Sequence, residues 1–163
     1  MTNAAPSKSA APSVVAEALA RVLADSYRLY VKTQNFHWNV VGPHFAPLHA
    51  QFQSQYEELA PAIDEVAERL RALGQRAPGS MKEFLALGTL PEAQNEELAD
   101  DMVRSLEKGH RALAQGAKAA LDAAQRAGDD VTVDLMVERI AAHDKAAWML
   151  ASFSYANGPT YRV

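Results

Sequence analysis

Four long stretches of this 163-residue chain repeat apolar residues every three or four positions, the spacing of one face of an α-helix. The stretches cover approximately residues 14–41, 47–73, 95–128 and 129–157. Ala and Leu are prominent and β-branched residues are sparse, which also favours helix. Four amphipathic helices, with the longest connection between the second and the third, predict an all-α four-helix bundle.

Glycine and proline interrupt the helical pattern at defined places. The Gly-Pro pair at residues 42–43 ends the first helix, and Pro61 is expected to kink the second helix or divide it in two. In the long connection, the segment 80–87 predicts a short extra helix. Gly109 and Gly116 lie on the apolar stripe of the third helix, so we expect them to permit close approach of a neighbouring helix.

Composition excludes several classes of protein. The chain has no cysteine, so it can form neither disulfides nor thiolate metal sites. No apolar run approaches the ~20 residues that cross a bilayer. The N-terminal segment is rich in Ala, Ser and Pro and lacks the apolar region of a signal peptide. We expect a cytoplasmic protein with a flexible tail at 1–13, one bundle domain at 14–157 and a short C-terminal tail at 158–163.

Two histidines flank the predicted turn between the first two helices. His37 and His49 lie six residues before and six residues after Pro43. In an antiparallel hairpin about that turn, both side chains stand at the same height on facing helices, as two imidazole ligands of a metal would. The alternative is that two histidines near a helix end hydrogen-bond or face solvent. His44 is assigned to the turn itself.

The candidate carboxylate ligands follow later on the second helix. Asp64 and Glu68 are four residues apart and share a helix face, although a solvated surface pair has the same spacing. Asp64 lies fifteen residues beyond His49, which is roughly 22 Å along a helix. These side chains therefore cannot hold one metal within a single chain. A two-fold partner packed antiparallel would bring its carboxylates to the histidines, in a site suited to ferrous iron or zinc.

The run "KTQNFHWNVVGPHFAPLHAQF", followed by "IDEVAERLRALG", resembles the Dps family of mini-ferritins, also called DNA-binding proteins from starved cells. The resemblance covers roughly residues 14–155 and includes "GDDVTVDLM" and "HDKAAWML". The positions that match the family pattern are Asn35, His37, Trp38, Asn39, Val40, Gly42, Phe45, Leu48, His49, Asp64, Ala67, Glu68 and Arg69.

This resemblance implies a ferritin-like bundle that assembles from two-fold dimers into a hollow dodecamer. His37 and His49 of one subunit, with Asp64 and Glu68 of its partner, would bind two iron ions, for which zinc would compete. The implied activity is that of a ferroxidase, an oxidoreductase that oxidises Fe(II), preferentially with hydrogen peroxide. Ferric mineral would be stored inside the shell, which protects DNA in oxidative stress.

Further positions carry roles by resemblance. Trp38 would donate electrons that trap stray oxidising equivalents, or it would pack at the dimer interface. Asp130 and Asp134 would line acidic pores for ion entry, although acidic residues also favour a helix start. Gln53 stands where some relatives have an acidic residue near the metals, and Lys118 stands where some have an acidic residue near the pore.

Two alternative functions follow from the same sequence. A nucleoid-associated role would use the N-terminal tail, but that segment offers Lys8 and the terminal amine, Arg162 adds one charge, and the net charge is −4. DNA affinity depends on the phosphates neutralised, so we expect weak or absent DNA binding. A di-iron site within one chain would need two Glu-x-x-His motifs. The chain has one, Glu107–His110, predicted to lie on the surface. His143 is predicted to be a hydrogen-bonded histidine of the core or of an interface rather than a ligand.

Overall fold

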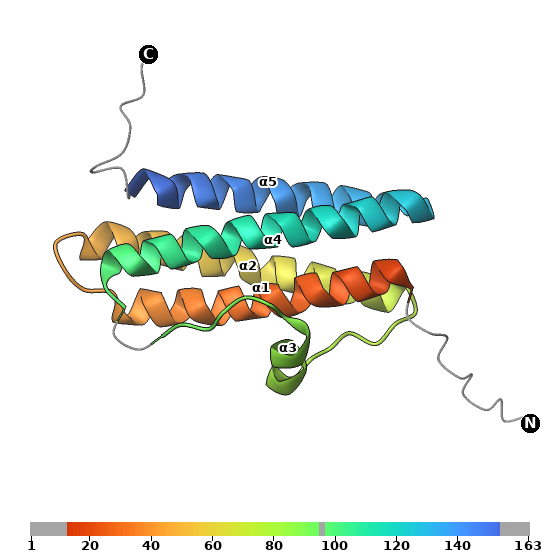
Figure 1. Ribbon diagram of the computed structural model, residues 1–163, viewed down its shortest axis with the longest axis horizontal. Coiled ribbons are helices and arrows are strands. Elements are labelled where there is room, and N and C mark those ends of the chain that lie inside the picture. Colours follow the sequence, from red (N-terminus) through yellow and green to blue (C-terminus); the bar gives the residue numbers. More distant parts are fainter. Residues whose placement is uncertain (1–12, 95–96, 154–163) are drawn as a thin grey trace, which may run out of the picture.

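The computed structural model describes residues 13–94 and 97–153, which form helices without any strand in these ranges. The helices are α1 (Val14–Asn39), α2 (Phe45–Ala72), α3 (Met81–Leu87), α4 (Ala99–Ala127) and α5 (Asp130–Phe153) (Figure 1). The predicted all-α bundle with a short extra helix in the long connection is confirmed.

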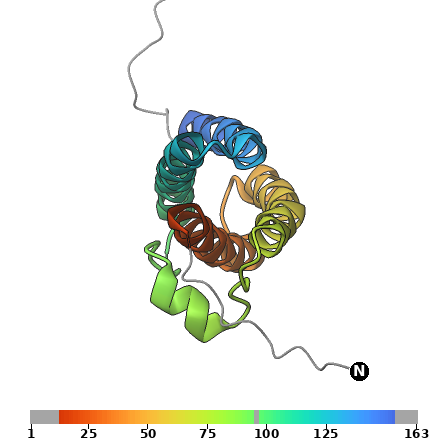
Figure 2. The same cartoon turned by 90° about the vertical axis from the view of Figure 1, so that its right-hand side faces the viewer.

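The four long helices surround a common core, as the view along the bundle shows (Figure 2). Helix α1 packs against α2 and α4, and α4 packs along α5, whereas α2 and α5 touch sparingly. Helix α3 lies outside the bundle against α1. The core is built from the apolar stripes of all four helices, and its largest fully buried side chains include Leu19, Leu29, Phe36, Phe52, Leu106, Met136 and Leu150.

Local signals fix where the helices begin and end. The Ser13 hydroxyl accepts a hydrogen bond from the Ala16 backbone N–H at the start of α1. Ser80 and Glu83 form a reciprocal capping box on α3. Gly42 adopts a φ of 112° in the turn between α1 and α2, and that left-handed conformation favours glycine. The turn places the end of α1 beside the start of α2.

The two expectations about helix interruption have different outcomes. Gly109 does permit close approach, because a Cβ there would lie 2.7 Å from Leu29 Cδ1 of α1. The same expectation for Gly116 is wrong, because a Cβ there would lie 4.0 Å from Val22 Cγ2, an ordinary contact distance. At Pro61 we expected a kink or a division of α2, and the division is wrong, since α2 is continuous from Phe45 to Ala72. Pro61 lies on the exposed face, while Leu59 and Ile63 beside it are buried in the core. We attribute the continuity to this burial, which offsets the loss of one backbone hydrogen bond.

The remaining boundaries differ modestly from expectation. Helix α4 begins at Ala99 rather than near residue 95, and residues 95–96 are outside the described ranges. The tail at 1–13, except Ser13, and the chain beyond Phe153, including the end expected for α5, also lie outside the described residues. None of the helices in the described ranges is both long and apolar enough to cross a membrane.

Candidate metal site

The side chains of His37 and His49 stack on each other and are held by hydrogen bonds across the α1–α2 turn. Their rings stack with centroids 3.7 Å apart and planes inclined by 23°. His37 Nδ1 donates to the His49 carbonyl oxygen, and His49 Nδ1 donates to the His37 carbonyl oxygen, each over 2.8 Å. Because a carbonyl oxygen can only accept, both Nδ1 atoms carry a proton. In the neutral rings, both Nε2 atoms therefore keep a lone pair for a metal.

Neighbouring rings hold this pair in position. His37, in the last turn of α1, is buried, whereas His49 on α2 is partly buried. Tyr56 stands edge-on to His37 with ring centroids 5.3 Å apart, and Phe45 lies 5.0 Å from His49. The predicted pairing of the two histidines at one height is confirmed, and packing restricts both rings to one orientation.

The candidate carboxylates lie far from the histidines within one chain. Asp64 and Glu68 are exposed on α2, one turn apart. Since α2 is uninterrupted, Asp64 is roughly 22 Å along the helix from His49. Across the described part of the chain, no three His, Asp or Glu side chains gather to hold a metal. Within one chain, the two candidate ligand pairs are therefore separate.

Arg69, beside Glu68, pairs with the start of α5. Its Nε donates to Thr132 Oγ1 over 2.9 Å, and its second guanidinium nitrogen donates to Asp129 over 2.6 Å. Asp129 also accepts from the Thr132 backbone N–H and so caps α5. Burial acts to raise the pKa of Asp129, but the hydrogen bonds from Arg69 and Thr132 hold it below its usual value. The contact fixes α5 relative to the Asp64–Glu68 segment.

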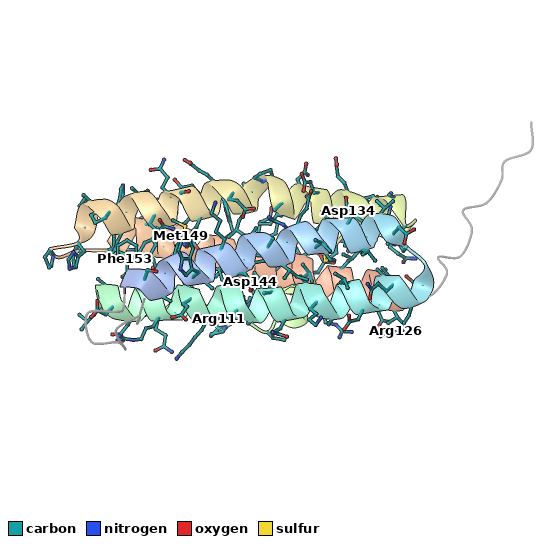
Figure 3. All side chains as sticks on the ribbon, turned by 90° about the horizontal axis from the view of Figure 1, so that it is seen from above. Arg111, Arg126, Asp134, Asp144, Met149 and Phe153 are labelled. Atoms are coloured by element: carbon teal, nitrogen blue, oxygen red, sulfur yellow. The ribbon has the colours of Figure 1, made fainter. Side chains whose placement is uncertain are left out.

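An acidic groove separates α2 from α5. Its volume is about 430 Å³, and its lining includes Glu65, Glu68, Asp134 and Glu138. Figure 3 shows Asp134 near one end of α5, while Phe153 marks the other. Asp130 is exposed in the first turn of α5. The groove thus joins one candidate metal ligand to one candidate pore residue.

Three other predicted positions are at the surface. Trp38, next to His37, is 68% exposed in the single chain. Gln53 is exposed, and its amide donates to Glu57 over 2.7 Å. Lys118 is exposed on α4. An exposed tryptophan beside His37 is compatible with both roles considered for Trp38.

A buried histidine pair was only partly anticipated. His143 is a hydrogen-bonded core histidine, as predicted, but the surface position predicted for His110 is wrong, because His110 is 2% exposed. Their Nδ1 atoms are 3.0 Å apart, so one ring donates to the other. Burial lowers the pKa of His110 to about 4 and that of His143 to about 3. The spacing of Leu106, His110 and Leu113 along one helix face could have revealed the burial.

This pair does not amount to a second metal centre. A cavity of about 330 Å³ between α2, α4 and α5 is lined by Gln55, Glu58 and His110, among others. Glu58, the carboxylate in that lining, is bound by Arg139. The cluster therefore lacks the several free carboxylates that an intrachain di-iron site requires.

Known proteins share both the sequence pattern and the fold. The family model for a ferritin-like domain matches residues 16–154. DNA protection during starvation protein 2 of Bacillus anthracis is 38% identical over 139 residues, which are 85% of this chain and 95% of that protein. The chain belongs to the Dps family of ferritin-like proteins. The predicted family is confirmed.

Solved Dps structures agree with this assignment. Dps from Staphylococcus aureus matches with a TM-score of 0.83 and 33% identity, covering 88% of this chain and 97% of that chain. Dps from Vibrio cholerae matches with a TM-score of 0.83 and 31% identity, covering 86% and 88%. The latter is described as a member of a broad superfamily of ferritin-like diiron-carboxylate proteins.

Proposed function

We propose that this Dps protein oxidises Fe(II) at sites shared between two subunits and stores the ferric product in a hollow homo-oligomeric shell. Hydrogen peroxide is the preferred oxidant, and removal of iron and peroxide protects DNA. Membership of the Dps family supports the general role in iron storage and DNA protection. The preferred oxidant, the two-iron site and the dodecamer are expectations from the family resemblance.

The reciprocal hydrogen bonds of His37 and His49 carry this proposal. They orient two imidazoles so that both unprotonated Nε2 atoms are available for a metal ion. A structural pair would have no need of two matched Nδ1 contacts that leave both Nε2 atoms free. Imidazole and carboxylate together form a donor set that binds ferrous iron well, and zinc would compete for the same atoms.

The carboxylates come from the second subunit. A two-fold axis that sets α2 antiparallel to its copy would bring Asp64 and Glu68 of the partner subunit to the histidine pair. The same operation creates an equivalent site at the other end of the interface. Two ferrous ions held together can each give one electron to peroxide, so both oxygens leave as water or hydroxide and no free hydroxyl radical forms.

The acidic groove supports a route for incoming iron. Asp130 and Asp134 would form part of an acidic entrance that concentrates cations. Glu68 and Asp134 line the same groove, together with Glu65 and Glu138. Ferrous ions would thus meet carboxylate oxygens from the entrance to the ferroxidase site.

Iron oxidation is the direct test of this function. Ferric product would be followed by absorbance after Fe(II) addition, with and without peroxide, in the wild type and in His37→Ala/His49→Ala. We expect the double variant to lose the rapid phase while its helical content and assembly size remain. Equal rates in the two proteins would refute the ferroxidase assignment.

DNA binding is the second candidate function, which the family name favours. The charged groups available to the tail are few, and they lie outside the described residues. We expect no tight complex at ~150 mM salt, because few phosphates would be neutralised. A gel shift with plasmid DNA tests this, and tight binding at that salt concentration would make nucleoid association the better description.

A further inference from the structure

All three tyrosines of the described ranges form one continuous row of rings that begins at the candidate metal site. Tyr56 of α2 stands edge-on to His37 at 5.3 Å between ring centroids. Tyr30 of α1 stands edge-on to Tyr56 at 6.1 Å, and Tyr27 stands edge-on to Tyr30 at 6.3 Å. Each separation lies within the 4.5–7 Å range of interacting aromatic pairs.

Helix spacing produces this row. Tyr27, Tyr30 and His37 are three and seven residues apart on α1, so they lie on one face. Tyr56 lies seven residues after His49 on α2, again on the face of the histidine. Helices α1 and α2 run antiparallel from their turn. Tyr30 and Tyr56 therefore face each other two helical turns further from that turn than His37 and His49.

We infer that Tyr56, Tyr30 and Tyr27 form a one-electron relay that removes oxidising equivalents from the ferroxidase site, an inference that rests on the proposed function. If these rings only packed against one another, phenylalanine would do so equally well, because it adopts the same edge-on geometry. Tyrosine adds a phenolic O–H that can be oxidised. The row ends at Tyr27, which stacks on Phe84 with centroids 4.3 Å apart, because phenylalanine is not oxidisable in this range.

The need for a relay arises when a single ferrous ion meets peroxide. One Fe(II) gives one electron, which yields Fe(III), hydroxide and a hydroxyl radical. Gln53 lies one turn after His49, but it carries no charge and its amide donates to Glu57, so it adds no carboxylate beside the histidine pair. Turnover with one iron bound is therefore expected at this site.

Each transfer in the relay moves one electron and one proton. The hydroxyl radical takes the phenolic hydrogen atom of Tyr56, which produces water and a Tyr56 phenoxyl radical. An electron from Tyr30 and a proton from water restore Tyr56, while Tyr30 releases its phenolic proton to water. The same exchange moves the radical to Tyr27. All three rings are partly exposed in the single chain, so water can take and return these protons.

The outer end of the row is open to a reductant. Tyr27 lines a cavity of about 260 Å³ between α1 and α3, and the charged residues of its lining are Arg28, Lys32 and Glu92. Two basic side chains against one carboxylate give the lining a net positive charge, which favours a small anionic donor. An enediol such as ascorbate would return one electron and one proton to the Tyr27 radical and leave the protein unchanged.

Freeze-quench electron paramagnetic resonance after peroxide addition, with about one Fe(II) per site, tests the relay. We expect a radical signal in the wild type that narrows when the tyrosine rings are deuterated. Tyr56→Phe should lose it, whereas Tyr27→Phe should keep it but lose the faster decay that ascorbate causes. Each replacement preserves ring packing. The double variant Tyr155→Phe/Tyr161→Phe is the control and should keep the signal.

The outcomes separate the relay from the function on which it rests. If wild-type protein oxidises iron rapidly but gives no tyrosyl signal, the relay is refuted and the ferroxidase assignment stands. An unchanged signal in Tyr56→Phe also refutes the relay. If wild type and His37→Ala/His49→Ala oxidise iron equally, the ferroxidase function itself fails.

Discussion

His37 and His49 each donate an Nδ1 hydrogen bond to the other residue's carbonyl oxygen, over the same 2.8 Å. The carbonyl oxygens at the end of α1 and the start of α2 thus select the tautomer of both rings. In many metal sites a carboxylate accepts the second N–H of a ligand histidine, whereas in this protein backbone carbonyl oxygens accept it. At the proposed metal site, this arrangement would make the orientation of both Nε2 atoms depend on the geometry of the hairpin.

Loss of either histidine should abolish rapid iron oxidation. In His37→Ala, one of the two imidazole ligands is absent, and the His49 ring has lost the ring on which it stacks. We therefore expect the same loss of rapid iron oxidation as in the double variant. The cost in stability should be about 1 kcal/mol for each lost hydrogen bond. Stopped-flow absorbance and thermal melting measure the two effects.

His44→Ala is the matched control for that experiment. His44 is exposed in the turn, between the two ligand candidates in sequence. Its replacement should leave iron oxidation at the wild-type rate. A comparable loss in His44→Ala would indicate that disruption of the turn, rather than removal of a ligand, explains the other variants.

Two glycines on one helix should respond in opposite directions to alanine. In Gly109→Ala the new Cβ would lie 2.7 Å from buried Leu29 Cδ1, so overpacking of about 1–3 kcal/mol should exceed the gain in helix propensity. In Gly116→Ala the new Cβ would lie 4.0 Å from Val22, and a gain of up to about 1 kcal/mol is expected. Thermal melting of both variants measures the contrast. Equal shifts would contradict the close packing of α4 on α1.

The buried His110–His143 pair should make the fold sensitive to mild acid. The folded-state pKa values are lowered from 6.5 to about 4 and about 3, so the unfolded chain binds more protons below pH 6.5. Stability should therefore be fully present above pH 6.5 and decline as the pH falls toward about 4. Thermal midpoints across this range measure the decline.

A variant without the titrating rings isolates their contribution. His110→Gln/His143→Gln should have a lower midpoint at pH 7 but a shallower fall between pH 6.5 and 4. A slope as steep as that of the wild type would show that other groups cause the acid sensitivity.

Arg69→Lys should destabilise the start of α5, although the substitution keeps the positive charge. One ammonium group cannot reproduce the two directed contacts to Thr132 and Asp129. We expect a loss of about 1–2 kcal/mol, together with faster amide hydrogen exchange in the first turn of α5. An unchanged rate of amide hydrogen exchange in that turn would contradict the view that Arg69 holds the start of α5 against α2.

Much of the fold could be predicted because helix periodicity and its interruptions act locally. The four long helices and the short α3 follow from stripes such as Leu19 and Leu29 and from the glycine of the α1–α2 turn. The continuity of α2 could not be predicted from Pro61, because its cost is offset by burial of Leu59 and Ile63 against other helices. Tertiary packing decides such cases.

The candidate site could be predicted in composition but not in its fine geometry. Equal spacing about Pro43 placed His37 and His49 at one height, and helix rise separated them from Asp64. Sequence spacing does not show which ring nitrogen is protonated. The tyrosine row was missed for a related reason: Tyr56 meets Tyr30 across two helices, which a pattern within one helix does not show.

The central claim is that each site is completed by two chains, and co-assembly of two inactive variants tests it most directly. His37→Ala/His49→Ala retains the carboxylates, and Asp64→Asn/Glu68→Gln retains the histidines. In a mixed dimer, one of the two sites has all its native ligands. Proteins co-expressed in equal amounts should recover about a quarter of the wild-type rate of Fe(II) oxidation. If co-assembled subunits stay as inactive as the separate variants, the shared site is contradicted.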